Sequence, residues 1–258
     1  MYEKPQKKLG QNFLVDKNIQ EKIIESCDLK NTDVVLEIGA GNAELTRHLE
    51  KKVKKVIALE IDKKLYFSLK ENFEAFSNIQ IINIDILKYK IKQKVIVVGN
   101  LPYYISTPII EHLIKQRKFV KEIFITIQKE LAERIVASPN TKEYSSFSCF
   151  VQFYNECKIL FHIKRNCFYP VPKVDSSFLR LTPRLYPKKV KDKDLLFKII
   201  RTSFQKRRKV LKNTLKELIP QETIQNALAK LNLSPTIRPE NLSLDDFIEL
   251  SNLIYHNT

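Results

Sequence analysis

The segment Val-Val-Leu-Glu-Ile-Gly-Ala-Gly, residues 34–41, decides the fold class of this chain of 258 residues. Its first part, residues 34–38, is a short apolar run rich in β-branched side chains, which is typical of a buried strand. The glycines that follow, Gly39 and Gly41, predict a turn at which the backbone can approach a ligand closely. A helical pattern begins near Ala43, so a helix N-terminus that favours negative charge lies beside this turn. The segment therefore predicts the strand–turn–helix unit of an α/β domain.

The alternation of strand and helix continues through the first two thirds of the chain. Four further runs rich in β-branched residues predict strands at residues 56–59, 79–82, 95–98 and 123–127. Stretches of helical periodicity lie between or after them, at residues 43–51, 63–73, 108–117 and 129–137. Residues 147–163 predict another helix and strand, and residues 176–181 predict a late strand that adds antiparallel to the sheet. This rhythm is typical of a parallel sheet covered by helices, here a Rossmann-like α/β domain.

The character of the sequence changes after Pro187. The remaining residues predict three or four short helices, interrupted at Pro220 and over residues 235–239, and they contain no strand pattern. We therefore predict a cofactor-binding and catalytic domain over residues 1–187, followed by a small all-α C-terminal domain over residues 188–258.

The basic residues are concentrated in this second domain. The chain has 45 Lys and Arg against 29 Asp and Glu, and residues 187–216 alone contain twelve basic and two acidic residues. Among them Lys206, Arg207, Arg208 and Lys209 are consecutive, within an amphipathic helical pattern. An unpaired cationic cluster repels itself, and a phosphate backbone would relieve that repulsion. We predict that the four residues bind RNA and that the domain contacts RNA or the ribosome; the alternative is a solvated helix face.

Composition excludes several other classes of protein. A hydrophobic content of 43% is enough to fill a core and excludes disorder as the main state. No window approaches 18 consecutive apolar residues, and residues 1–8 lack the apolar run of a secretory signal. The four cysteines show no C-x-x-C spacing and the four histidines are scattered, so neither a disulfide framework nor a metal site is expected. We expect a cytoplasmic protein, monomeric, without a membrane or metal partner.

Acidic residues at successive strand ends predict the cofactor. Glu44 stands where a dinucleotide-binding fingerprint has its third glycine, which argues against NAD and for a smaller adenosine ligand. Glu60 follows the second strand, where a carboxylate can accept hydrogen bonds from both ribose hydroxyls. Asp85 follows the third strand and could accept from an adenine amino group, although each carboxylate could also be a helix cap. With Gly39 and Gly41 they share one edge of the sheet and predict a site for S-adenosyl-L-methionine.

The fourth strand leads into Asn100-Leu101-Pro102-Tyr103, a pattern typical of methyltransferases that act on the exocyclic amino groups of bases. An adenine N6 is a weak nucleophile because its lone pair is delocalised into the ring. The side-chain oxygen of Asn100 and the carbonyl of Leu101 can accept its two hydrogens, which aims the lone pair at the methyl group. Tyr103 offers a ring on which an extruded base can stack. The alternative is a strand exit marked by Pro102, with the aromatic residues in the core.

Five motifs in order resemble one known family. They are GQNFL at residues 10–14, EIGAG at 37–41, GNLPY at 99–103, FYPVPKVDS at 168–176 and RPENLS at 238–243. Over nearly its whole length the chain resembles the small-subunit ribosomal RNA adenine N6,N6-dimethyltransferase family, the KsgA (RsmA) group. The resemblance implies transfer of methyl groups from S-adenosylmethionine to N6 of two adjacent adenosines in the hairpin loop near the 3′ end of 16S rRNA. It also implies that the substrate is an immature 30S-type particle during small-subunit assembly.

The resemblance further implies roles for single residues. Around the cofactor it assigns closure to Asn12 and Leu14, the methionine part to Gly39, the ribose to Glu60 and the adenine to Asp85. Asn100 faces the methyl group and the target amine, and Phe168 stacks on the target base opposite Tyr103.

Two alternative functions stay open at this point. One is a large-subunit rRNA adenine methyltransferase of the antibiotic-resistance type, which shares the Asn-Leu-Pro-Tyr type of motif. The other is a non-catalytic ribosome-assembly or RNA-binding factor. Residues 172–176 and 238–243 favour the small-subunit group. Tyr104 and Ala40 depart from the family pattern, where Asn and Pro are common, and Tyr104 is predicted to alter the tolerance of the pocket for a monomethylated base.

Overall fold

The computed structural model of the chain describes residue 6 and residues 9–255. The chain divides into two compact units. The first consists of Met1–Ala132 and Glu156–Pro183, and the second of Glu133–Asn155 and Arg184–Thr258.

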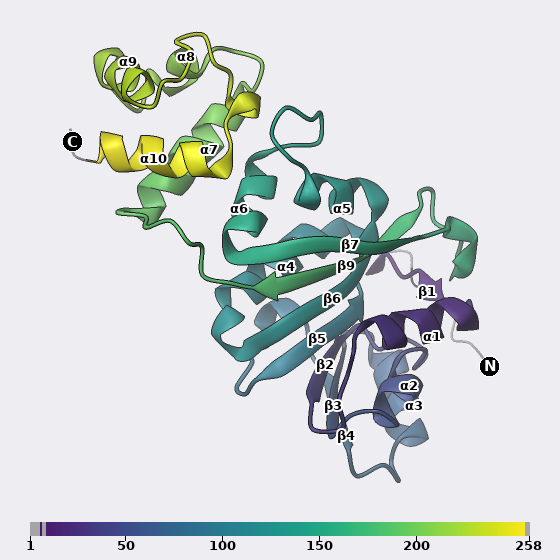
Figure 1. Cartoon of the computed structure of the whole chain (residues 1–258). Coiled ribbons are helices and arrows are strands. Elements are labelled where there is room, and N and C mark those ends of the chain that lie inside the picture. The colour runs from purple at the N-terminus through teal and green to yellow at the C-terminus, as the bar shows by residue number, and fades with distance from the viewer. Residues whose placement is uncertain (1–5, 7–8, 256–258) are drawn as a thin grey trace. The chain divides into compact units, whose positions relative to one another are not determined.

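A seven-stranded sheet in the order β4-β3-β2-β5-β6-β9-β7 forms the centre of the first unit (Figure 1). Its strands are β2 (Val34–Ile38), β3 (Lys55–Glu60), β4 (Ile79–Asn83), β5 (Val95–Asn100), β6 (Val120–Gln128), β7 (Asn155–Ile163) and β9 (Ser176–Pro183). The strands from β4 to β6 pair in parallel, and β9 pairs with β6 antiparallel. These pairings confirm the predicted Rossmann-like α/β fold and its late antiparallel strand.

Helices and short turns connect the strands of this unit. They are α1 (Lys17–Ser26), α2 (Thr46–Glu50), α3 (Lys63–Asn72), η2 (Ile86–Lys88), η3 (Tyr103–Ile105), α4 (Ser106–Lys115), η4 (Arg117–Phe119) and η5 (Arg165–Cys167). Helix α5 (Lys129–Val136) begins in this unit, and its residues from Glu133 on belong to the second. A separate two-stranded sheet pairs β1 (Phe13–Leu14) with β8 (Phe168–Tyr169), antiparallel. It ties the N-terminal segment to the loop before β9.

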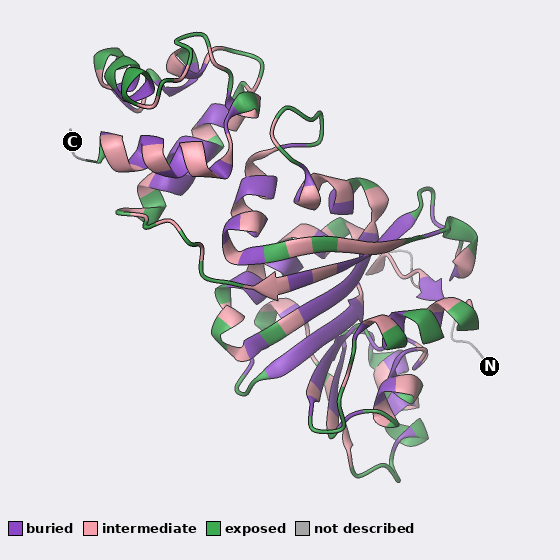
Figure 2. Ribbon diagram, in the orientation of Figure 1, coloured by how far each residue is buried: buried purple, intermediate pink, exposed green. Residues whose placement is uncertain are grey.

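The central strands are buried along most of their length (Figure 2). Parallel strands that helices cover on both faces need apolar side chains on both faces, which explains their continuous Val, Ile and Leu runs. The strand order reverses at β2: β3 and β4 lie on one side of it, β5 and β6 on the other. Ligands of open α/β sheets bind beyond the carboxyl ends of the strands at such a switch point.

The second unit is helical and has its own apolar core. It contains α6 (Ser146–Tyr154), α7 (Lys193–Gln205), α8 (Leu211–Leu215), α9 (Gln221–Lys230), η6 (Pro239–Asn241) and α10 (Leu244–Ile254). The predicted single boundary between residues 187 and 188 leaves α6 in the other domain. Helix α6 belongs here because Phe150 and Phe153 pack edge-on against Phe197 of α7, with ring centroids 5.5 and 5.3 Å apart.

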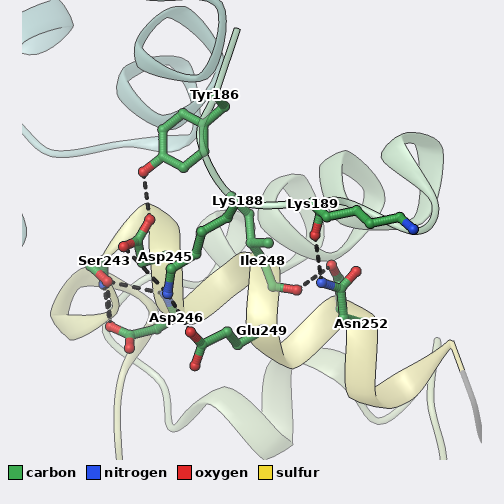
Figure 3. Close-up of polar contacts among 10 residues, drawn as sticks. Tyr186, Lys188, Lys189, Ser243, Asp245, Asp246, Ile248, Glu249 and Asn252 are labelled. Atoms are coloured by element: carbon green, nitrogen blue, oxygen red, sulfur yellow. Dashed lines mark hydrogen bonds and ion pairs between the residues drawn. The ribbon is translucent and has the colours of Figure 1, made fainter.

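Polar contacts fasten the segment before α7 to α10, and they use one of the basic residues of 187–216. Tyr186 donates a hydrogen bond of 2.6 Å to Asp245 Oδ1 at the start of α10 (Figure 3). Lys188 forms ion pairs with Asp245 and Glu249 on the same helix. The segment before α7 is thus fastened to α10, and Lys188 is paired with two carboxylates of the unit itself.

The structure also corrects the predicted position of the basic cluster, residues 206–209. Helix α7 ends at Gln205, so the cluster forms the turn between α7 and α8 instead of a helix face. Arg207 lies partly buried and donates from Nε and Nη2 to Glu240 Oε2 at 2.9 and 2.7 Å. Its Nη1 donates to Lys142 O at 2.6 Å. Arg207 therefore joins three segments of the unit, and only its three neighbours in the cluster are exposed.

Replacement of Arg207 by Ala is expected to lower the free energy of unfolding by roughly 1–3 kcal/mol, because Glu240 and a backbone carbonyl lose their donor. The exposed neighbour provides the matched control: Arg208→Ala should change stability by no more than about 0.5 kcal/mol. Urea unfolding followed by circular dichroism measures both. Equal losses in the two variants would contradict the structural role of Arg207.

Candidate functional site

A cavity lies at the carboxyl ends of β2 and β5, where the strand order reverses. The space between its walls is about 700 Å³ when the open solvent at its mouth is included, so the site is a partly open cleft. Its walls come from residues 9–14, from the end of β2 and the loop after it, from Glu60 and Ile61, and from residues 100–102. The N-terminal segment and three strand ends thus meet at the site that the topology predicts.

The loop after β2 depends on its two glycines. Gly39 and Gly41 have φ angles of +72° and +58°, in the left-handed region that residues with a side chain rarely adopt. A Cβ on Gly41 would also lie 3.1 Å from Glu44 Oε2 and 3.2 Å from the Phe13 ring. At Gly39 the nearest atom to such a Cβ is Asn100 O at 3.8 Å, so the backbone there is open to a ligand.

Ala43, in the same loop, has φ +70° and is buried. An alanine in this region costs roughly 1–2 kcal/mol relative to the right-handed conformation. Helix α2 consequently begins at Thr46 and not near Ala43, as the sequence pattern predicts. The loop beside the cavity is strained, and the sheet around it holds it in place.

Ala43→Gly is expected to raise the free energy of unfolding by up to about 1 kcal/mol, because glycine removes the left-handed strain but has more freedom in the unfolded chain. The control is Ala229→Gly at an exposed position of α9, which should destabilise by about 0.5–1 kcal/mol. Urea denaturation of the cofactor-free protein measures both, and a loss of stability in Ala43→Gly would show that the loop is not strained.

Glu60, predicted to bind a ribose, connects the ends of two strands. It is buried, its Oε2 accepts a hydrogen bond of 2.9 Å from Gly41 N, and its Oε1 accepts one of 2.8 Å from Asp62 N. Burial raises the pKa of Glu60. Each carboxylate oxygen has a second lone-pair position, so the group can still accept from two ribose hydroxyls.

Two further carboxyl groups, to which the sequence analysis assigns no contact, lie in the same cavity. Glu37 is only 2% exposed and accepts from Thr46 Oγ1 at 2.7 Å. Burial raises its pKa to about 8, and the charges of Glu44 and Glu60 add to the effect. Burial also raises the pKa of Glu44 to about 7, with Glu60 contributing. The sequence contains a signal for each group: Glu37 is a glutamate inside a buried strand, and Glu44 is a glutamate inside the loop that follows the two glycines.

Asn100 ends β5, and the N-terminal segment orients its amide. Asn100 Nδ2 donates to Asn12 O at 2.7 Å, and Asn12 Nδ2 donates to Gly10 O at 3.2 Å. Among the residues that the structure describes, Asn100 Oδ1 has no hydrogen-bond partner. The acceptor end of this side chain is therefore free, as the predicted chemistry requires.

The N-terminal segment is fastened on both sides of the cavity. Gln6 Nε2 and Gln11 Nε2 donate to Asp62 Oδ2 at 2.6 and 3.2 Å. On the other side, a Cβ added to Gly10 would come within 2.8 Å of the Tyr104 ring, so this ring packs directly on the backbone. Tyr104, the predicted departure from the family pattern, thus contacts the segment that covers the cavity.

The rest of the Asn-Leu-Pro-Tyr motif is anchored by neighbouring strands. Leu101 and Pro102 line the cavity, and Leu101 N donates to Thr126 O at 3.0 Å. The hydroxyl of Tyr103 lies 2.6 Å from Ser176 Oγ at the start of β9. These contacts fix the backbone and the ring on either side of the proline.

Three predicted residues do not line this cavity: Tyr103, which follows the lining residue Pro102, Asp85 and Phe168. Asp85 caps η2 by accepting from Leu87 N at 2.9 Å, two residues beyond β4 and at the same edge of the sheet. Phe168 is only 1% exposed and belongs to the same apolar cluster as Leu14. Alternate residues of a strand face opposite ways, so Tyr169 is the exposed member of β8 and Phe168 presents no free ring face to a base.

Among the residues that the structure describes, no group of three or more His, Cys, Asp or Glu is arranged to hold a metal ion. No helix in those residues is long and apolar enough to cross a membrane.

The open backbone at Gly39, the carboxylates beside it and the free Asn100 oxygen fit an adenosine cofactor with a positively charged centre. Together with the fold, they define the chain as a Rossmann-like S-adenosylmethionine-dependent methyltransferase. A family model described as ribosomal RNA adenine dimethylase matches residues 2–256. The chain belongs to the ribosomal RNA adenine dimethylase family.

Individual relatives agree with this assignment. Ribosomal RNA small subunit methyltransferase A of Caldanaerobacter subterraneus subsp. tengcongensis is 43% identical over 265 residues, which cover 98% of each chain. The crystal structure of a dimethyladenosine transferase from Plasmodium falciparum superposes with a TM-score of 0.81 at 28% identity, covering 92% of this chain and 95% of that one. The 23S rRNA methyltransferase ErmE gives a TM-score of 0.76 at 24% identity, over 95% of this chain and 100% of that one, and shows the common fold alone.

Proposed function

We propose that the chain methylates N6 of two adjacent adenosines in the hairpin loop near the 3′ end of 16S rRNA and produces N6,N6-dimethyladenosines. The observation that carries this proposal is the amide of Asn100, which lines the cavity, donates to Asn12 O and has no partner for its oxygen among the described residues. Relatives named small subunit methyltransferase A support the choice of substrate. We further propose that the substrate is an immature 30S-type particle and that the protein acts as a cytoplasmic monomer in ribosome assembly.

In the proposed mechanism Asn100 and Leu101 prepare the nucleophile. S-adenosylmethionine, when bound, supplies a methyl group on a positively charged sulfur. Asn100 Oδ1 accepts one hydrogen of the adenine N6 and the Leu101 carbonyl accepts the other. Both bonds strengthen as the nitrogen becomes pyramidal, so they stabilise the transition state more than the ground state. Pro102 fixes the chain direction after these two acceptors.

Tyr103 is the proposed stacking partner of the extruded base. Its hydroxyl is held by Ser176, which limits rotation of the ring. Stacking on an aromatic face is worth roughly 1–3 kcal/mol, comparable to the cost of extruding a base from a loop. Phe168 could take the opposite face only after leaving the core, so we assign the stacking to Tyr103 alone.

Asn100→Ala is expected to lower the rate of dimethyladenosine formation by at least about 100-fold, because a transition-state acceptor is lost. Asn12→Ala is the matched control. It retains the backbone carbonyl that orients Asn100, so its rate at saturating cofactor should stay within a few-fold of the wild type. Mass spectrometry of the RNA measures both rates, and near-normal turnover of Asn100→Ala at an unchanged melting temperature would refute the mechanism.

The same assay tests the substrate. Immature small subunits and naked large-subunit RNA are offered in parallel, and we expect dimethyladenosine at adjacent positions of the former. Methylation of the large-subunit RNA alone would instead identify the resistance-type activity. Binding of subunits without any methylation would identify a non-catalytic assembly factor.

We also propose that the outward-facing cations of the second unit bind the RNA backbone. Lys206, Arg208 and Lys209 are exposed, as are Lys198 and Arg201, which lie three residues apart on one face of α7. In the described part of the chain none of the five has an acidic partner. Arg207, which the sequence pattern groups with them, is left out because Glu240 occupies it.

If these cations and one more contact about six phosphates of looped RNA, the logarithm of the affinity should fall against the logarithm of the salt concentration with a slope of roughly −4. Substitution of Arg208 and Lys209 by Ala should reduce this slope by about 1.4 and leave the affinity for S-adenosylhomocysteine unchanged. Substitution of Lys51 and Lys52, two exposed residues of the first unit, is the charge-matched control. Filter binding measures the slope, and equal effects of the two pairs would contradict the proposal.

A further inference from the structure

Glu44 has a buried oxygen without a partner. Its Oε2 accepts a hydrogen bond of 3.0 Å from Asn42 N, but its Oε1 is inaccessible to solvent and bonded to no group among the described residues. Leaving a buried carboxylate oxygen unsatisfied is unfavourable. Because Glu44 lines the cavity, its carboxyl group lies close to any group that enters there.

The charges around Glu44 are all of one sign. Glu37 on β2 and Glu60 at the end of β3 line the same cavity, and Asp62 follows Glu60 by two residues. No Lys, Arg or His is among the described residues that line it. The N-terminal segment contributes only uncharged side chains from residues 9–14. Among the residues that the structure describes, the cavity therefore concentrates carboxyl groups without a counter-charge, and a cation inside it would be stabilised.

Methyl transfer changes the charge of the cofactor by one. The donor S-adenosylmethionine has a positive sulfonium, and the product S-adenosylhomocysteine has a neutral thioether in its place. We propose that Glu44 is a specificity residue that makes this cavity favour the cationic donor over the neutral product and thereby promotes product release. The proposal rests on the placement of the cofactor in this cavity, which is part of the proposed function.

The preference for the donor should depend on pH. Burial raises the pKa of Glu44 to about 7, with Glu60 adding to the effect. Below that pH the group is mostly neutral and does not distinguish the two ligands; above it the carboxylate attracts the sulfonium. The ratio of donor to product affinity should therefore rise between pH 6 and pH 8. Glu37, with a pKa raised to about 8, titrates in an overlapping range, so Glu44→Gln should remove only part of this rise.

Isothermal titration calorimetry with S-adenosylmethionine and with S-adenosylhomocysteine tests the proposal on the full chain. At pH 8, Glu44→Gln is expected to weaken binding of the donor roughly tenfold and of the product less than about twofold, because one screened charge–charge attraction is lost. Glu71→Gln removes the same charge from an exposed position of α3 and should change neither affinity. Thermal melting checks the fold of both variants, and the pH series on the wild type needs no substitution.

The outcomes separate this inference from the function on which it rests. Equal weakening of both ligands would mean that Glu44 contacts a part they share, and unchanged affinities would mean that it contacts neither; both results overturn the specificity role. If Glu60→Ala also left both affinities unchanged, the cofactor would not occupy this cavity, and the proposed site itself would fail. A selective loss of donor affinity in Glu44→Gln, absent in Glu71→Gln, supports the proposal.

Discussion

The hydrogen bond from Asn100 Nδ2 to Asn12 O is the constraint on which the rest of the site depends. A primary amide has a donor end and an acceptor end, and only the acceptor can receive a hydrogen from an amine. By occupying the donor end, the backbone of residue 12 determines which end of Asn100 is free. The N-terminal segment that lines the cavity and the side chain that we propose contacts the target base are therefore coupled. Loosening of that segment from Asp62 or Tyr104 would disturb the chemistry as well as the cavity.

The fold around the cavity holds in place a strained backbone and carboxyl groups that repel one another. Three carboxyl groups are crowded at the ends of β2 and β3, and Ala43 keeps a left-handed backbone in the loop between them. The buried parallel strands provide the rigid support for this arrangement, because their register fixes Ile38 opposite Gly99 and Leu59. Repulsion among the carboxyl groups favours the binding of a cation, because the positive charge of the ligand relieves that repulsion.

The sequence predicts those features that depend on neighbours along the chain. Apolar runs of β-branched residues gave the strands, and the pair Gly39 and Gly41 gave the turn at the switch point. Features that depend on distant partners were not predictable. Arg207 looks like part of an external cluster until Glu240, 33 residues later, occupies it, and α6 lies between two elements of the sheet unit but shares the core of the C-terminal helices. The strand of Phe168 and Tyr169 is too short to reveal by periodicity which side chain faces inward.

The chain has a net charge of +16, but the carboxyl groups of its cavity and the exposed cations of its second unit suit different ligands. RNA is a polyanion and needs cations at the surface, whereas the methyl donor is a cation and needs carboxylates around it. The first unit buries its carboxylates in a cavity whose described lining contains no basic side chain. The second unit uses Lys188 and Arg207 internally and leaves other cations exposed. The surface cations have little influence on a ligand in the cavity, because solvent and salt screen exposed charges at distances beyond about 10 Å. Salt screens the buried carboxyl groups far less, so those that are ionised act strongly on a ligand in contact with them.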